Sequence, residues 1–197
     1  LSIMKRLLAY LFIVLGLGFT FNANAEDNDI RDFQIEGMSI GDSALDYFTK
    51  EEIKKNSQNY YKDKTFTPVQ MDNFPFFKTY SSVDFVYKTN DPNYIIHFIS
   101  GVIDYKNIKI DRCYNKLDII VDDLRIFLTD FQEIKKKVVT PAFDPKGKIT
   151  RVIFLTPEGG IIAVNCYDYS LANGGGDHLG LEIVTKKFND WLLTEQR

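Results

Sequence analysis

Hydrophobic and polar positions alternate along several stretches of the chain, which is the pattern of strands that bury one face. The alternation is clearest over residues 83–88, and a turn-forming segment separates them from a second stretch rich in β-forming residues, 94–105. The stretches 148–156 and 160–169 repeat this arrangement around a turn that contains proline and glycine. The pattern therefore predicts two antiparallel hairpins.

Three other segments have apolar residues at helical spacing. In 111–129 apolar residues recur every three or four positions and form one continuous face. The segment 40–56 has a similar stripe and a charged end, and 185–196 is amphipathic. We expect a helix in each segment. The first has two possible starts one turn apart, because Ser39 and Ser43 each open a capping sequence, and we expect Ser39 to be a cap because serine is among the preferred capping residues.

The order of these elements predicts the fold class. A short strand over 179–184 follows the second hairpin. Another strand, over 65–71, would be confined to a sheet edge because Pro68 cannot donate a ladder hydrogen bond. Since consecutive hairpins form antiparallel sheets, we expect an α+β fold. Its antiparallel sheet would be built from two hairpins plus one strand, with helices packed on one face.

The N-terminal segment has the pattern of a secretory signal peptide. Two basic residues directly after Met4 precede the uncharged stretch 7–21, and Ala23-Asn24-Ala25 supplies the small residues that a signal peptidase reads. About 15 apolar residues is short for a bilayer crossing, which needs roughly 20. We expect cleavage of 1–25, no stable membrane anchor afterwards, and a single globular domain over 26–197 in the periplasm or outside the cell. An uncleaved membrane anchor is the alternative.

Composition and charge narrow the range of partners. The chain has 197 residues, with 24 Lys and Arg against 27 Asp and Glu, a net charge of −3. Binding to nucleic acid needs clustered basic residues, so we expect no nucleic-acid partner. The lysine run 135–137 is interpreted as a solvated face.

The two cysteines are expected to form a disulfide, because an exported protein folds in an oxidising compartment. Cys113 begins the apolar face of the helix predicted over 111–129. Cys166 follows Ile162 and Val164 at a spacing of two, so the three share one strand face. The two sulfurs can meet if the helix covers that face. Two separate buried thiols, or an intermolecular link, are the alternatives.

Two patterns could carry hydrolytic chemistry. Gly37-Met38-Ser39-Ile40-Gly41 matches the Gly-x-Ser-x-Gly elbow, which places a nucleophilic serine between a strand and a helix. Asp177-His178, after the glycine-rich run 174–176, could orient a general base or bind a metal. A capping serine and a solvated loop pair are the simpler interpretations. We therefore assign no catalytic residue, metal site or cofactor, and keep a small hydrolase as the alternative function.

The segment Ile35-Glu36-Gly37-Met38-Ser39, read as opening a helix, resembles the start of the SmpA/OmlA-type modules of the bacterial envelope. These modules resemble the β-lactamase inhibitor proteins in fold. The resemblance implies helices packed on an antiparallel sheet and a function in binding proteins. Such modules usually have two helices before their strands, and many are lipoproteins; one helix is expected here, and no cysteine stands near the cleavage point.

The function expected from these observations is that of a non-enzymatic binding or envelope-interaction module, with an envelope protein or a small ligand as partner. Aromatic side chains are enriched at binding hot spots. The candidate binding residues are Tyr60, Tyr61, Phe76, Phe77, Asp177 and His178. The alternative for the aromatic residues is that their rings cover the sheet as part of the core.

The first prediction concerns processing. In an exporting host the mature protein should begin at Glu26, because the small residues before it form the cleavage site. N-terminal sequencing of the exported protein tests this directly. Mature protein that still contains Met4 would contradict the prediction.

Overall fold

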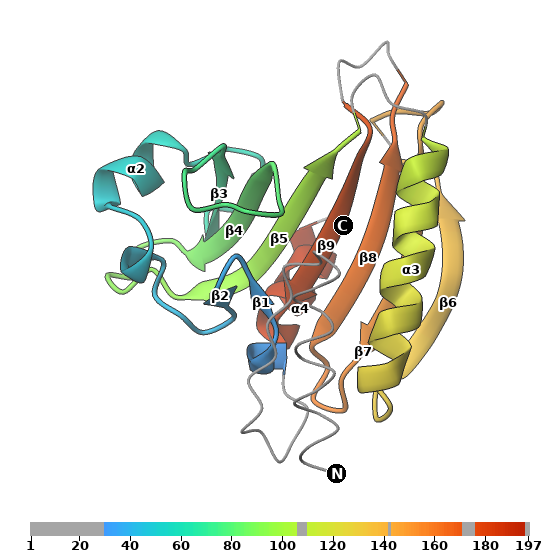
Figure 1. Ribbon diagram of the computed structural model, residues 1–197. Helices are drawn as coiled ribbons and strands as arrows, with labels where there is room; N and C mark the ends of the chain where they lie inside the picture. Colours follow the sequence, from blue (N-terminus) through green and yellow to red (C-terminus); the bar gives the residue numbers. More distant parts are fainter. Residues whose placement is uncertain (1–29, 106–109, 142, 171–175, 196–197) are drawn as a thin grey trace.

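The computed structural model describes residues 30–105, 110–141, 143–170 and 176–195. The predicted signal peptide lies outside the described residues, as do Gly174 and Gly175. The main element is a seven-stranded antiparallel sheet with the order β3-β4-β5-β9-β8-β7-β6 (Figure 1). Its strands are β3 (Phe66–Asp72), β4 (Ser82–Lys88), β5 (Ile96–Asp104), β6 (Gln132–Val139), β7 (Lys148–Leu155), β8 (Ile161–Asp168) and β9 (His178–Val184).

The remaining elements are short except for two helices. Two short strands, β1 and β2, pair as a separate small hairpin. The bounds are η1 (Ile30–Asp32), β1 (Gln34–Ile35), β2 (Met38–Ser39), η2 (Ala44–Asp46), α2 (Lys50–Lys55), α3 (Asp111–Phe127) and α4 (Lys186–Glu195). Among the described residues, no helix combines the length and the apolar character that a bilayer crossing requires.

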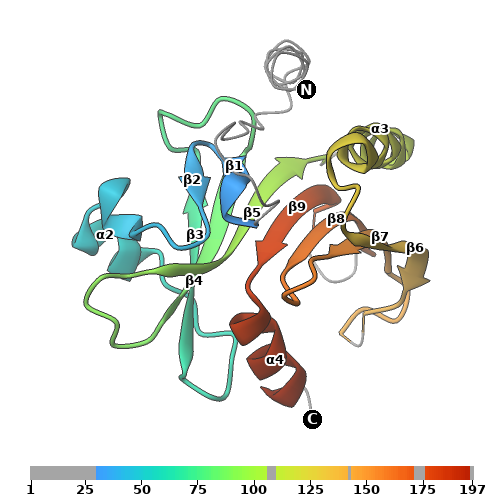
Figure 2. The same ribbon diagram turned by 90° about the horizontal axis from the view of Figure 1, so that it is seen from below.

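Helices cover both faces of the sheet. α3 packs over β8 and β9 on one face and buries Cys113, Leu117 and Val121 there. α4 lies on the opposite face, where its Phe188 is buried with Phe66 and other residues of a smaller apolar cluster. Figure 2 shows the two helices on opposite sides of the strands. The α+β class and the antiparallel sheet are confirmed, whereas the expected five-strand sheet with helices on one face is wrong.

The helix predicted over 40–56 is largely wrong. The backbone at Glu36, Gly37 and Gly41 has positive φ angles of 52°, 85° and 91°, so the chain turns twice where a helix was expected to begin. The first turn closes the β1–β2 hairpin, and α2 starts only after Thr49. There Thr49 and Glu52 form a capping box, which satisfies the free amide groups at the start of that helix.

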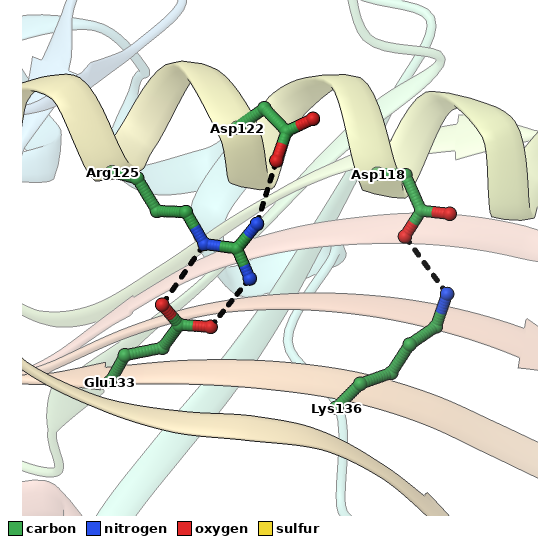
Figure 3. A network of polar contacts seen from close by, with 5 residues as sticks. All are labelled: Asp118, Asp122, Arg125, Glu133 and Lys136. Atoms are coloured by element: carbon green, nitrogen blue, oxygen red, sulfur yellow. Dashed lines mark hydrogen bonds and ion pairs between the residues drawn. The ribbon is translucent and has the colours of Figure 1, made fainter.

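The strand β6 was missed because its lysine run was interpreted as a solvated face. This run lies on an edge strand, and Figure 3 shows how α3 is tied to it. Arg125 of α3 donates to both carboxylate oxygens of Glu133, at 3.0 and 2.7 Å, and Lys136 pairs with Asp118 at 2.8 Å. Charged groups along an edge oppose the addition of a further strand.

The predicted disulfide is present. Cys113 and Cys166 are bonded, with their Cα atoms 5.9 Å apart, and the link joins the first turn of α3 to β8. The pairing follows from two periodicities: one places Cys113 on the buried face of the helix, and the other places Cys166 on the sheet face below it. Both residues are fully buried.

The second prediction concerns this link. Its two cysteines are 53 residues apart in the sequence. Replacing both cysteines by alanine should lower the free energy of unfolding by about 4 kcal/mol, because the unfolded chain regains the entropy of an open loop of that length. Urea denaturation of the oxidised protein and of the double variant measures the difference. Reductant should destabilise the oxidised protein and leave the variant unchanged; equal stability of the two proteins would contradict the prediction.

Candidate functional site

The sheet face that carries α4 is divided into apolar and polar rows by the strand register. Side chains that point to this face from neighbouring strands lie side by side, because paired residues of adjacent strands share a face. One row contains only apolar residues, namely Pro68, Val86, Phe98, Val184 and Ile161. α4 packs on the end of the face that carries this row.

Beyond this row the same face becomes polar. The next row consists of Gln70, Asp84, Ser100, Glu182 and Ala163. The row after it consists of Asp72, Ser82, Val102, Gly180 and Asn165, and the last of Asp104, His178 and Tyr167. The strands β3, β4, β5 and β9 therefore change from apolar to polar at the same level, and β8 changes one row later, at Asn165, so that an apolar end and a polar end lie on one continuous surface.

The polar rows line a groove that consists of two adjoining hollows. The inner hollow has a volume of about 210 Å³ and is lined by Ser100, Gly180 and Glu182 among others. The outer hollow, of about 780 Å³, extends to Asp104 and Phe143. The two share the residues Tyr60, Gln70, Asp84, Val102 and His178, so they form one surface feature, which we call the sheet groove.

Aromatic rings form walls of the sheet groove. The ring of Tyr167 stacks on His178 with ring centres 4.3 Å apart, and Tyr169 lies next to Phe143 at 5.6 Å. Tyr60, from the segment before β3, contributes a ring that is 66% exposed. Such rings offer faces of negative electrostatic potential to a ligand.

Gly180 leaves room at the bottom of the groove. A Cβ atom at this position would lie 3.3 Å from the ring of Tyr167, 3.4 Å from a carboxylate oxygen of Glu182 and 3.6 Å from the hydroxyl of Ser100. The missing side chain therefore leaves a space bounded by an aromatic ring, a carboxylate and a hydroxyl group.

Two carboxylates, those of Asp84 and Glu182, lie in the same row, and Glu182 has the stronger hydrogen-bond support. Its Oε1 accepts a hydrogen bond of 2.7 Å from the hydroxyl of Tyr167. Burial raises the pKa of Glu182, while the hydrogen bond from Tyr167, the charge of Arg151 and a hydrogen bond with Asn165 oppose this rise. The pKa of Tyr167 is raised in turn, by its burial and by the negative charge of Glu182.

Asp84 has no such support. Its Oδ1 is buried and has no hydrogen-bond partner among the described residues. Burial, followed by the negative charges of Asp72 and Glu182, raises the pKa of Asp84 to about 7. A buried carboxylate without a donor is costly, and the costs of burial and of like charge add up here. Above about pH 7, where Asp84 is ionised, its carboxylate has no counter-charge among the described lining residues.

The charges that line the groove have one sign, while the positive charge of Arg151, which pairs in register with Asn165 on the same face, acts on Glu182 from outside the lining. Four carboxylates line its two hollows, from Asp72, Asp84, Asp104 and Glu182, and no lysine or arginine is present among the described lining residues. A metal ion would need several ligands in one place. In the part of the chain that the structure describes, no three His, Cys, Asp or Glu side chains are grouped so that they could hold one.

The structure places the candidate binding residues from the sequence in different regions. Tyr60, Tyr61 and His178 line the sheet groove. Tyr61 packs against Trp191 of α4, with ring centres 4.8 Å apart. Phe76 and Phe77 lie against Phe48 on the α3 side of the sheet, and Asp177 accepts a hydrogen bond from the backbone N–H of Tyr169. The six residues do not form one site.

Sequence reasoning missed the main acidic residues, Asp84 and Glu182. Each interrupts an otherwise apolar strand at a position that alternation assigns to the second face. The signal was thus present in each strand separately. That both residues belong to one row follows only from the register through β5, which brings together positions almost a hundred residues apart.

Ser39 does not cap a helix. It lies in β2, is 6% exposed, and its hydroxyl donates to the carbonyl oxygen of Phe33 at 3.1 Å. Its neighbours Met38 and Ile40 belong to the core on the α3 side, whereas His178 faces the sheet groove on the other side. The capping prediction was wrong because the glycine turns produce a hairpin instead of a helix.

Comparisons of this chain with protein-family models, with curated proteins and with solved structures found no match. The resemblance of 35–39 to envelope modules therefore stays an expectation. The case for a function rests on the geometry of the sheet groove.

The third prediction concerns Asp84 and pH. Its pKa in the folded protein is about 7 against 3.8 as the ordinary value, so unfolding releases a proton between these pH values. The stabilisation that protonated Asp84 contributes to the folded protein is complete below about pH 4, and it is lost as the pH rises to about 7. The whole loss should be up to about 4 kcal/mol, since one pKa unit corresponds to about 1.4 kcal/mol.

Asp84→Asn should remove this loss and be more stable than the parent above about pH 7. Urea denaturation of both proteins across the pH range measures the effect. Asp104→Asn, at an exposed carboxylate of the same face, is the matched control and should keep the parent's pH profile. Parallel profiles of the parent and Asp84→Asn would show that Asp84 is ionised throughout.

Proposed function

We propose that this protein is an exported, non-enzymatic binding protein whose sheet groove holds a ligand through an organic cation. Export is supported by the signal-like pattern of 1–25 and by the disulfide, which is typical of oxidising compartments. The ligand chemistry is supported by the residues that line the groove. One observation carries it: the carboxylate of Asp84 has a buried oxygen without a hydrogen-bond donor, and other negative charges lie beside it.

A cationic ligand would supply what the groove lacks. Any cation at Asp84 would offset the repulsion from Asp72 and Glu182, and an ammonium group that carries N–H would in addition donate to the unpaired oxygen. A pair formed in a partly desolvated site is stronger than one on the open surface, because the surrounding dielectric constant is lower. Binding would therefore relieve a cost that the free protein bears.

The aromatic walls fit the same class of ligand. A cation placed over a tyrosine or phenylalanine ring gains about 0.5–2 kcal/mol, depending on how far it is desolvated. Tyr60 and Phe143 offer large exposed rings, at 66% and 67% exposure, next to the carboxylates. Carboxylates combined with aromatic faces suit an organic ammonium ion better than a small, strongly hydrated metal ion.

The hydrolase alternative gains little from the contacts found. The hydroxyl of Ser39 is engaged with the carbonyl oxygen of Phe33 in the core. In the Asp177-His178 pair, Asp177 accepts from the backbone of Tyr169, and His178 Nδ1 lies 2.9 Å from the carbonyl oxygen of Gly176. Both side chains thus have structural partners, which favours binding over turnover.

The fourth prediction tests the cation requirement. Tetramethylammonium should bind in the sheet groove, whereas tert-butanol, a neutral molecule of similar shape, should not. NMR titration gives the affinity, and shifts of the Gly180 and Glu182 amide signals locate the site. Asp84→Asn should weaken binding of tetramethylammonium by at least about tenfold, because the cation loses its buried partner.

Asp118→Asn is the control for a lost aspartate charge. Asp118 is on α3, on the opposite side of the sheet, and its partner is Lys136. This variant should bind tetramethylammonium as the parent does. If tetramethylammonium and tert-butanol give equal affinities, or if the shifts appear away from the groove, the proposed function is wrong.

A further inference from the structure

We infer that the ligand is a linear aliphatic diamine or polyamine that lies along β5, with one ammonium group between Asp84 and Glu182 and a second at Asp104. This inference rests on the proposed function and specifies its ligand. It is carried by the order of side chains along β5 and its neighbours: two carboxylates at the inner end, the uncharged Val102 between Ser82 and Gly180, and a carboxylate at the outer end.

The two carboxylates at the inner end of the groove belong to a single row of the sheet. Ser100 of β5 pairs with Asp84 on one side and with Glu182 on the other, so the two carboxylates flank it on the same face. With neighbouring strands about 4.8 Å apart, the two backbone positions are separated by roughly 10 Å, which leaves space for one ammonium group between the side chains. The unpaired Oδ1 of Asp84 and the space above Gly180 lie at this end.

Along β5 the middle of the groove is uncharged: Val102 lies between Ser82 and Gly180, while Asp72 of the same row is two strands away on β3. Val102 is the next residue of β5 on this face, and it lines both the inner and the outer hollow. Tyr60 lines both hollows as well. A hydrocarbon chain between two ammonium groups would contact these side chains and would leave no polar group of its own unpaired.

The outer end carries the second negative charge. Asp104 is the last residue of β5, exposed, and paired in register with His178. It lies four positions after Ser100, which corresponds to about 13 Å along a strand. Asp72, exposed at the end of β3, lies on the same side of the groove. The spacing between the charged ends thus suits two ammonium groups joined by a chain of several methylene groups.

Two other occupants fit less well. A metal ion lacks a grouped set of ligands among the described residues. A lysine side chain of a peptide could enter the inner hollow, of about 210 Å³, but its single ammonium group would not reach from there to Asp104. A slender amine can enter this hollow with an ammonium group and a few methylene groups.

The test compares amines of equal length and different charge. Octane-1,8-diamine and octylamine share one hydrocarbon chain, while butane-1,4-diamine has two charges that are too close together to reach both ends. Affinities are measured by calorimetry at about pH 8, where Asp84 is ionised. The octane diamine should bind at least about tenfold more tightly than octylamine and than the butane diamine, and spermidine should also exceed the butane diamine.

Two variants locate the charges. In Asp104→Asn, octane-1,8-diamine should lose its advantage over octylamine, whereas in Asp84→Asn both amines should bind weakly. Asp118→Asn should keep the parent's ratio of the two affinities. Circular dichroism and the urea midpoint of each variant show that it is folded.

The possible results separate this inference from the proposed function. If tetramethylammonium binds at the groove but the octane diamine has no advantage over octylamine, the diamine inference is overturned and the cation site stands. If a lysine-containing peptide binds more tightly than the octane diamine, the ligand class is overturned in favour of a peptide. If none of the cations binds, both proposals fail.

Discussion

The register between β4, β5 and β9 is the constraint on which the site depends. Antiparallel hydrogen bonding fixes which residues of these strands are opposite one another, and a shift by one residue would turn every side chain to the other face. In the observed register, apolar positions align with apolar ones beneath α4, and acidic positions align with one another beyond it. The core and the groove are therefore two results of the same pairing.

Local patterns predicted the elements that depend on periodicity. The helix at 111–129, both hairpins, and the contact between Cys113 and Cys166 followed from residue spacing alone. The helix at 40–56 failed because the turns at Gly37 and Gly41 outweigh its apolar stripe. The sheet groove could not be predicted, because its carboxylates come from strands whose pairing is set by long-range packing. Tyr60 and His178 were found as single residues, without the neighbours that give them a role.

The groove departs from the rule that buried polar groups are paired, and this is its main physical feature. Most of the sheet is stabilised by burial of apolar side chains, which leaves a margin of stability for a locally unfavourable charge. The unpaired carboxylate of Asp84 uses part of that margin of stability. The carboxylate of Glu182 costs less, because the hydroxyl of Tyr167 donates a hydrogen bond to it. Such a concentrated cost is typical of sites that gain their missing partner on binding.

The disulfide has a consequence for recognition as well as for stability. Cys166 directly precedes Tyr167, so the covalent link to α3 fixes the backbone beneath the aromatic ring that stacks on His178 and holds Glu182. This wall of the groove is therefore ordered before any ligand arrives. A preorganised wall loses little conformational entropy on binding, so more of the contact energy appears as affinity. The disulfide thus shapes the proposed binding surface on one face of the sheet through a bond on the other.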